Sequence, residues 1–162
     1  MGDRLTEDQK VAGSSPAHPT SILLREVLEE DLPIFFEQQL DPEAVRMAAF
    51  PSRGRDAFFA HWRKIMADPR ALLRTVVADG RVAGNVVSHP NGDAREVGCW
   101  LGRAFWGRGV ATRALDLFLR EETTRPLHAH GATRNAGSIR ALEKCGFRVV
   151  GEGGGEVVMR LG

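Results

Sequence analysis

The stretch FWGRGVATRAL, from Phe105 to Leu115, places two glycines around one arginine, and an apolar run at helical spacing follows. A loop that opens directly into a helix presents unpaired backbone N–H groups and the positive end of the helix dipole. Such a site binds anions, above all phosphates. Glycines at 107 and 109 let the backbone approach a ligand and adopt conformations that other residues resist. Ordinary turns share this pattern, so the rest of the chain decides its meaning.

Two familiar phosphate-binding patterns do not match this stretch. The nucleoside-triphosphate loop requires Gly-Lys-Ser/Thr after four spacer residues, and that sequence is absent. The dinucleotide pattern requires a third glycine, where this chain has Thr112, and a carboxylate about 20 residues further on. Glu121 and Glu122 are too close to serve as that carboxylate. Both classes of nucleotide binder are therefore disfavoured.

The chain around this stretch predicts a mixed α/β domain built on one central sheet, because strand-like and helix-like patterns are interleaved. An Asp-Gly pair at 79–80 predicts a tight hairpin turn, and Gly98 predicts a bulge. The proline-punctuated segment 41–55 is expected to be a connector that shapes the acceptor site. Strands are expected at 22–27, 72–78, 81–88, 95–101, 127–130, 147–152 and 156–161, and helices within 29–39, 55–68, 109–121 and 138–145.

Length and composition limit the function classes. The 162 residues fit one domain, at 22–162, and the polar segment 1–21 is expected to be a disordered tail. A formal net charge of +1 gives no indication of a nucleic-acid partner. No apolar run reaches the roughly 18 residues of a membrane span. Cys99 and Cys145 form neither a metal-ligand spacing nor a disulfide framework, so we expect a cytoplasmic protein that needs no metal.

A second stretch, NAGSIRALEKCGF from Asn135 to Phe147, gives the first one its context. Together with WLGRAFWGRGVATRAL (100–115), it resembles the GCN5-related N-acetyltransferase (GNAT) superfamily, and in particular its branch of ribosomal-protein N-terminal acetyltransferases. The resemblance covers residues 22–161. It implies the GNAT fold, a mixed sheet of about six to seven strands flanked by about four helices. It also implies transfer of an acetyl group from acetyl-CoA to a primary amine.

The resemblance assigns a set of residues to the cofactor. In the family, backbone N–H groups of the loop that corresponds to 106–111 hold the coenzyme A pyrophosphate, and Thr112 is expected to add a hydroxyl. The preceding strand splays from its neighbour, so its exposed backbone would pair with the pantetheine arm. Asn135 would bond the pantetheine, and Ser138 would lie near the thioester sulfur. The implied set is Cys99, Trp100, Leu101, Trp106, Gly107, Arg108, Gly109, Val110, Ala111, Thr112, Asn135 and Ser138.

Two of the predicted site residues are expected to move protons. An amine with a pKa near that of Lys, about 10.4, must lose a proton before it can attack. Glu96 begins the strand that leads to the thioester and is the candidate base; the alternative is an exposed acid on an edge strand. Family members often carry a tyrosine that protonates the leaving thiolate, but this chain has Leu142 there and no tyrosine at all. Ser138 or a water is expected to replace it, and helix capping is the other role open to Ser138.

Several alternatives stay open. The acceptor is either a protein N-terminus or lysine, or a small amine. The missing tyrosine also leaves room for a non-catalytic acyl-CoA-binding domain on the same fold. Homodimers are frequent in the family, although no feature of this sequence shows one. His128 and His130 share one face of a predicted strand, which suits a metal pair or, since no third ligand is evident, histidines on the substrate side or in solvent.

Overall fold

A computed structural model describes residues 20–48 and 52–162 of the chain. In these ranges seven strands form one mixed sheet in the order β1-β2-β3-β4-β5-β7-β6, so the predicted fold class is confirmed. The strands are β1 Ile22–Arg25, β2 Leu72–Ala78, β3 Arg81–Asn91, β4 Ala94–Leu101, β5 Leu127–Ala132, β6 Arg148–Gly153 and β7 Glu156–Leu161. The helices are α1 Leu32–Leu40, α2 Pro42–Met47, α3 Arg55–Met66, α4 Val110–Glu121 and α5 Ala136–Lys144.

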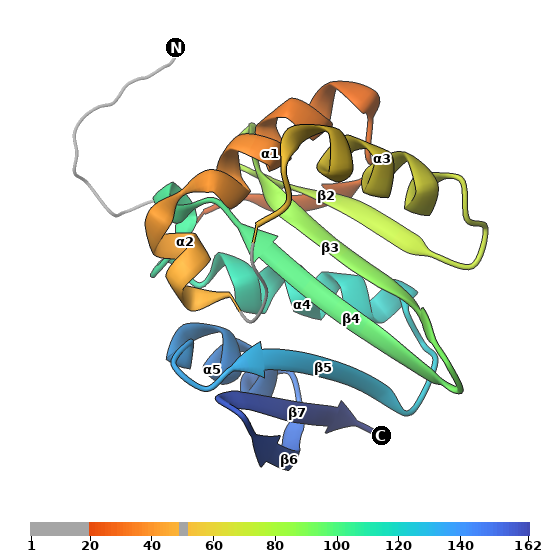
Figure 1. Ribbon diagram of the computed structural model, residues 1–162. Coiled ribbons are helices and arrows are strands. Elements are labelled where there is room, and N and C mark those ends of the chain that lie inside the picture. Colours follow the sequence, from red (N-terminus) through yellow and green to blue (C-terminus); the bar gives the residue numbers. More distant parts are fainter. Residues whose placement is uncertain (1–19, 49–51) are drawn as a thin grey trace.

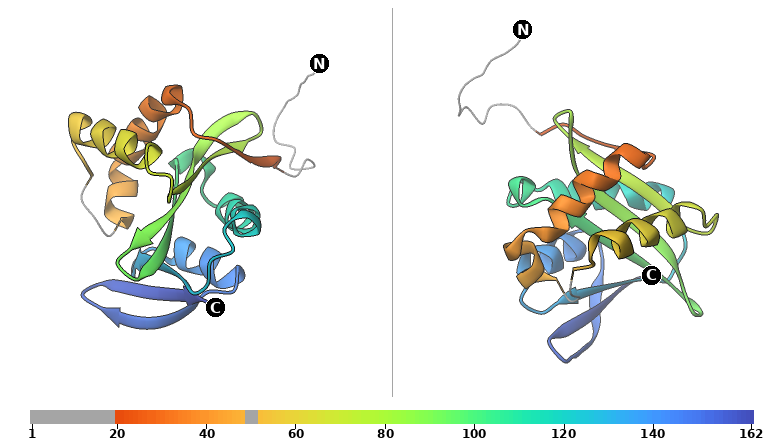
Figure 2. Two further views of the ribbon diagram at one scale, coloured as in Figure 1. Left: turned by 90° about the vertical axis from the view of Figure 1, so that its right-hand side faces the viewer. Right: turned by 45° about the horizontal axis from the view of Figure 1, so that its top comes forward.

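Helices cover both faces of the sheet (Figures 1 and 2). Helices α1 and α3 pack on one face through an aromatic cluster that includes Phe35, Phe36, Phe58 and Trp62. Helix α4 packs on the other face, against β1 to β4, and α5 lies beside it. The larger core lies on this second face, where Val110, Ala114, Leu115 and Phe118 of α4 are buried. Each face therefore buries the apolar stripe of its own helices.

The hairpins that join β2, β3 and β4 follow from turn chemistry. Asp79 and Gly80 both have positive φ, 51° and 79°, as a two-residue turn between right-twisted strands requires. The predicted loop at 89–94 is shorter than expected, because β3 continues to Asn91 and β4 starts at Ala94. The predicted bulge at Gly98 is wrong: Gly98 pairs with Val87 in an unbroken β3–β4 register. This glycine instead has open space where a side chain would project.

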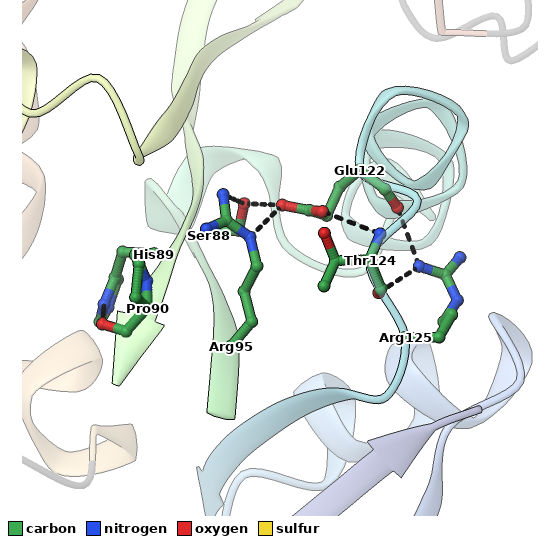
Figure 3. A network of polar contacts seen from close by, with 7 residues as sticks. All are labelled: Ser88, His89, Pro90, Arg95, Glu122, Thr124 and Arg125. Atoms are coloured by element: carbon green, nitrogen blue, oxygen red, sulfur yellow. Dashed lines mark hydrogen bonds and ion pairs between the residues drawn. The ribbon is translucent and has the colours of Figure 1, made fainter. Parts of the chain in front are cut away.

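A buried carboxylate ties the end of α4 to the sheet (Figure 3). The Oε1 atom of Glu122 accepts hydrogen bonds from the Ser88 hydroxyl and, at 2.6 Å, from Nε of Arg95. Its Oε2 atom accepts from the backbone N–H of Thr124 at 3.1 Å. Burial of Glu122 opposes ionisation, but these hydrogen bonds outweigh it and lower the pKa of the carboxyl to about 2. The network joins the C-terminal end of α4 to β3 and β4.

Two parts of the sequence-based description fall outside the described ranges. These are residues 1–19 of the predicted tail and residues 49–51 of the predicted connector, whose other residues include helix α2. Thr20 and Ser21, the last two residues of the predicted tail, are bonded to the domain, because Arg113 donates to the Thr20 carbonyl and Ser21 N–H donates to Asp79 at 2.8 Å. None of the helices in the described ranges is long and apolar enough to cross a bilayer.

Candidate functional site

A gap opens between β4 and β5, the pair of parallel neighbours in the sheet. The registered pairing between them is confined to Glu96 and His128, whereas β3 pairs with β4 along its whole length, to Leu101. Beyond Glu96 the two strands diverge, as Figure 1 shows. The segment from Cys99 to Leu101 therefore has a β-strand partner on the β3 side alone among the described residues. Its other edge can bond an extended ligand.

The loop between β4 and α4 presents a row of unpaired backbone donors. In the described part of the chain, the N–H groups of residues 107–112 have no hydrogen-bond acceptor. The N–H of Trp106 differs, because it donates to the carbonyl of Arg103 at 3.1 Å. Gly107 and Gly109 have φ of 73° and 74°, in the left-handed region that favours glycine. Consecutive donors at the start of a 12-residue helix make a concave site for an anion.

The space beside this loop is open at both glycines. A side-chain carbon at Gly107 or Gly109 would meet no atom within 4 Å, so the backbone at both positions faces open space. The Arg108 side chain turns aside, since its Nη2 pairs with Asp79 at 3.2 Å and its guanidinium lies 5.7 Å from the Phe105 ring centre. The anion site is therefore formed by backbone N–H groups rather than by the Arg108 side chain. Thr112 is half-buried in the first turn of α4.

Asn135 begins helix α5 and has internal partners. Its Oδ1 accepts from the N–H of Ser138 at 3.1 Å, so the helix cap is Asn135 and not Ser138. Its Nδ2 donates to the carbonyl of Met47 at 3.4 Å, which joins the start of α5 to the end of α2. Ser138 is half-buried in the first helical turn. Leu142 is buried in the core, and its side chain carries no proton donor.

Cys99 is not equipped for nucleophilic chemistry. It lies on the face of β4 that packs against the larger core, with Val97 and Leu101. Burial raises the pKa of its thiol to about 12. At neutral pH the reactive thiolate is therefore essentially absent. The side chain packs against the larger core instead.

Glu96 lies at the closed end of the gap, on the opposite face from Cys99. Its side chain is 22 % exposed. The Oε2 atom accepts a hydrogen bond from Nδ2 of Asn91 at 2.7 Å and lies 3.0 Å from Nε2 of His130 on β5. The Nδ1 atom of His130 lies 3.4 Å from Oε1 of Glu156 on β7. The structure thus brings the predicted base together with three polar residues that sequence reasoning did not connect to it.

Two further polar side-chain atoms near the gap belong to residues that the sequence analysis named without assigning these atoms a contact. Nε1 of Trp100 on β4 and Nδ1 of His128 on β5 are buried, and neither has a hydrogen-bond partner in the described part of the chain. Both residues lie on the same face of the sheet as Glu96. Trp100 is four residues after Glu96 on β4, and His128 is the Cα partner of Glu96 on β5. An open cavity of about 620 Å³, bordered by Asn91 and His128 among others, adjoins this end of the gap. His128 lines this cavity, whereas Trp100 is not among its lining residues.

Comparisons with known proteins agree with this geometry. Residues 21–148 match the family model of the acetyltransferase (GNAT) domain. A domain from Methanocaldococcus jannaschii is 19% identical with a TM-score of 0.75, over 88% of this chain and 98% of that one. Spermidine N-acetyltransferase from Vibrio cholerae, solved with CoA and spermine, is 18% identical with a TM-score of 0.71, over 86% and 92%. RimL, a ribosomal L7/L12 α-N-protein acetyltransferase solved with CoA, is 18% identical with a TM-score of 0.72, over 90% and 94%. No curated protein sequence matches the chain.

Proposed function

The chain belongs to the GNAT acetyltransferase family, and from this premise we propose that it transfers an acetyl group from acetyl-CoA to a primary amine. One observation carries the proposal: the six consecutive N–H groups of residues 107–112, which have no acceptor among the described residues, follow the strand that lines a gap between two parallel strands. The first feature suits a diphosphate and the second suits an extended amide-containing arm. Coenzyme A contains both groups in one molecule.

Acetyl-CoA would supply an acetyl group activated as a thioester. The N–H groups of 107–112 would hold its diphosphate, and the free edge of Cys99, Trp100 and Leu101 would bond its pantetheine arm. A backbone N–H at Trp100 or Leu101 would stabilise the oxyanion that forms during attack. Because the Cys99 thiol has a pKa of about 12, an acyl-cysteine intermediate is disfavoured. The amine is therefore expected to attack the thioester directly.

Glu96 is the base in this proposal. An amine with a Lys-like pKa of about 10.4 is protonated at neutral pH and must lose a proton to become nucleophilic. Glu96 is half-buried at the closed end of the gap, and its Oε1 has no partner among the described residues. Ser138, or a water near it, would protonate the thiolate. Free thiols have a pKa of about 8.5, so this leaving group needs no strong acid.

The acceptor belongs to one of two classes. A protein N-terminus or lysine is one, in keeping with RimL, and a small amine is the other, in keeping with the spermidine N-acetyltransferase. An acceptor panel with acetyl-CoA, read by release of free thiol, tests the activity and separates these classes. Tight CoA binding with no turnover on any amine would instead favour a non-catalytic acyl-CoA-binding domain.

The role of Glu96 has its own test. Glu96→Gln removes the proton acceptor and keeps the size of the side chain, so kcat is expected to fall about a hundredfold. The loss should be visible across pH 6 to 9, while the KM for acetyl-CoA stays near its wild-type value. A variant with full kcat over this range would exclude Glu96 as the base.

A further inference from the structure

We propose that His130 is a positioning residue for Glu96: with Asn91 it fixes one carboxylate oxygen, so that the other faces the amine, and Glu156 holds the imidazole in place. The inference rests on the proposed acetyl transfer. It adds His130, Asn91 and Glu156 to the site and assigns the reacting atom, Oε1 of Glu96.

The two carboxylate oxygens of Glu96 differ in their contacts. Oε2 accepts from Nδ2 of Asn91 at 2.7 Å and lies 3.0 Å from Nε2 of His130. Oε1 has no partner among the described residues. A carboxylate that is held at one oxygen keeps a fixed direction for the other, which is what proton transfer within hydrogen-bond distance requires.

The imidazole is itself held from both sides. Its Nε2 points to Glu96 on β4, and its Nδ1 lies 3.4 Å from Oε1 of Glu156 on β7. Ionised carboxylates can only accept, so Nε2 donates to Glu96, and Nδ1 donates to Glu156 as well when the ring carries a proton on each nitrogen. Glu156 thus limits rotation of the ring, in the way that a carboxylate behind a histidine orients its imidazole. The three side chains form a line across three strands.

Sheet register puts this line at the point where the gap opens. Glu96 and His128 are Cα partners, so the next residues on the same face are Gly98 on β4 and His130 on β5. The strands have begun to separate there, and the His130 side chain reaches back across the gap to Glu96. Gly98 leaves the adjoining space open, since no atom lies within 4 Å of its missing side chain. The charged and titratable groups nearest to His130 are Glu96, Glu156, His128 of its own strand and Arg160, which is the Cα partner of His128 on β7.

The test compares His130→Phe with His130→Gln. Phe keeps a ring but has no donor, whereas Gln offers an N–H near the place of Nε2. We expect His130→Phe to lower kcat by about tenfold or more and to move the acidic limb of the pH–rate profile to higher pH, because hydrogen bonds to a carboxylate favour its charged form. His130→Gln should recover most of the loss, and Asn91→Ala should shift the same limb in the same direction. The KM for acetyl-CoA should change less than about twofold in all three variants.

His89→Phe is the matched control. His89 is the Cα partner of Glu96 on the other neighbouring strand, β3, but its Nδ1 contacts the carbonyl of Pro90 and not the carboxylate. The kcat and the pH profile of His89→Phe should match those of the wild type. Melting curves and CoA binding by calorimetry establish that each variant is folded; if His130→Phe does not fold, Asn91→Ala and His130→Gln carry the comparison.

The outcomes separate the two proposals. An unchanged kcat and pH profile in His130→Phe, or in Asn91→Ala if the former does not fold, overturns the positioning role while acetyl transfer stands. Equal losses of kcat in His130→Phe and His130→Gln, with no shift of the acidic limb in either variant, also overturn the positioning role. A wild-type protein that binds CoA and acetylates no amine overturns the proposed function itself. An acidic limb that moves to higher pH in His130→Phe, with kcat largely recovered in His130→Gln, supports both the positioning role and acetyl transfer.

Discussion

The indole Nε1 of Trp106 donates a hydrogen bond to the carbonyl oxygen of Leu101 at 3.0 Å. Leu101 is the last residue of β4, and Trp106 immediately precedes the row of unpaired N–H groups. The bond therefore fixes the distance between the strand edge proposed for the pantetheine arm and the loop proposed for the diphosphate. Trp106 belongs to the predicted cofactor-binding set, but no contact was predicted for its indole side chain; the residue is 36% exposed.

Replacement of Trp106 by Phe removes this one donor and keeps an aromatic ring. We expect the KM for acetyl-CoA to rise by about three- to tenfold, which corresponds to the loss of one hydrogen bond of about 1 kcal/mol. The kcat at saturating acetyl-CoA should stay within about twofold, because the residue lies at the donor end and not beside Glu96. Steady-state kinetics with acetyl-CoA as the varied substrate measure both. A fall in kcat at unchanged KM would contradict the role of Trp106 in fixing the distance between the strand edge and the loop.

Local pattern was sufficient for the order of the seven strands and of four of the five helices in the described ranges; helix α2 lies in the segment predicted as a connector. The Asp79-Gly80 turn was predicted because it depends on a few neighbouring residues, and Gly80 has positive φ. The end of β3 was missed because Pro90 suggested a loop, whereas strand pairing with Arg95 keeps it extended. Tertiary pairing overrides such local signals.

In the candidate site, too, the parts that depend on neighbouring residues could be predicted and the parts that depend on tertiary pairing could not. The anion-binding loop is contiguous in sequence, so it could be found from spacing and resemblance. The partners of Glu96 come from β3 and β5, and Glu156 on β7 contacts His130 in turn; no spacing rule connects Asn91, His130 and Glu156 across the chain. They meet because parallel pairing starts at Glu96 and His128. That register is a property of the whole sheet.

Gly109 and Gly54 form a natural pair for a test of the loop geometry. Both residues cap the start of a helix and both have open space where a side chain would project. Gly109 has φ of 74°, whereas Gly54 has φ of −66°. Gly109→Ala should therefore cost about 1–2 kcal/mol and lower Tm by about 3–6 °C, and it should weaken CoA binding. Gly54→Ala should leave Tm within about 2 °C and CoA affinity unchanged. Thermal melts and calorimetry measure both; equal effects in the two variants would contradict the argument.

Arg108 is expected to contribute little to CoA affinity. Its side chain pairs with Asp79 at 3.2 Å, and both partners are well exposed. Exposed pairs are weak and screened by salt, and the anion site itself is made of backbone N–H groups. Arg108→Gln should raise the Kd for CoA by less than about threefold at physiological salt. A much larger loss, abolished by high salt, would show that the guanidinium leaves Asp79 to bind the diphosphate.

Glu122 should make stability depend on acidic pH. Its pKa is lowered from 4.5 to about 2: burial opposes this shift, and the hydrogen bonds from Ser88, Arg95 and Thr124 outweigh it. Its contribution is therefore present above pH 4.5 and is lost as the pH falls from 4.5 towards 2, where the folded protein also takes up the proton. By linkage this contribution is at most about 3 kcal/mol.

The measurement compares Glu122→Gln with Glu121→Gln by chemical denaturation between pH 7 and pH 2. Glu122→Gln should be clearly less stable than the wild type at pH 7, since it leaves Arg95 without its charged partner. The difference should shrink below pH 4.5 and be smallest near pH 2. Glu121 is the adjacent carboxylate on the same helix, paired with Arg74 at 2.7 Å but 41% exposed, so its replacement should change stability by less than about 0.5 kcal/mol. A constant difference between Glu122→Gln and the wild type across the whole pH range would contradict a lowered pKa at Glu122.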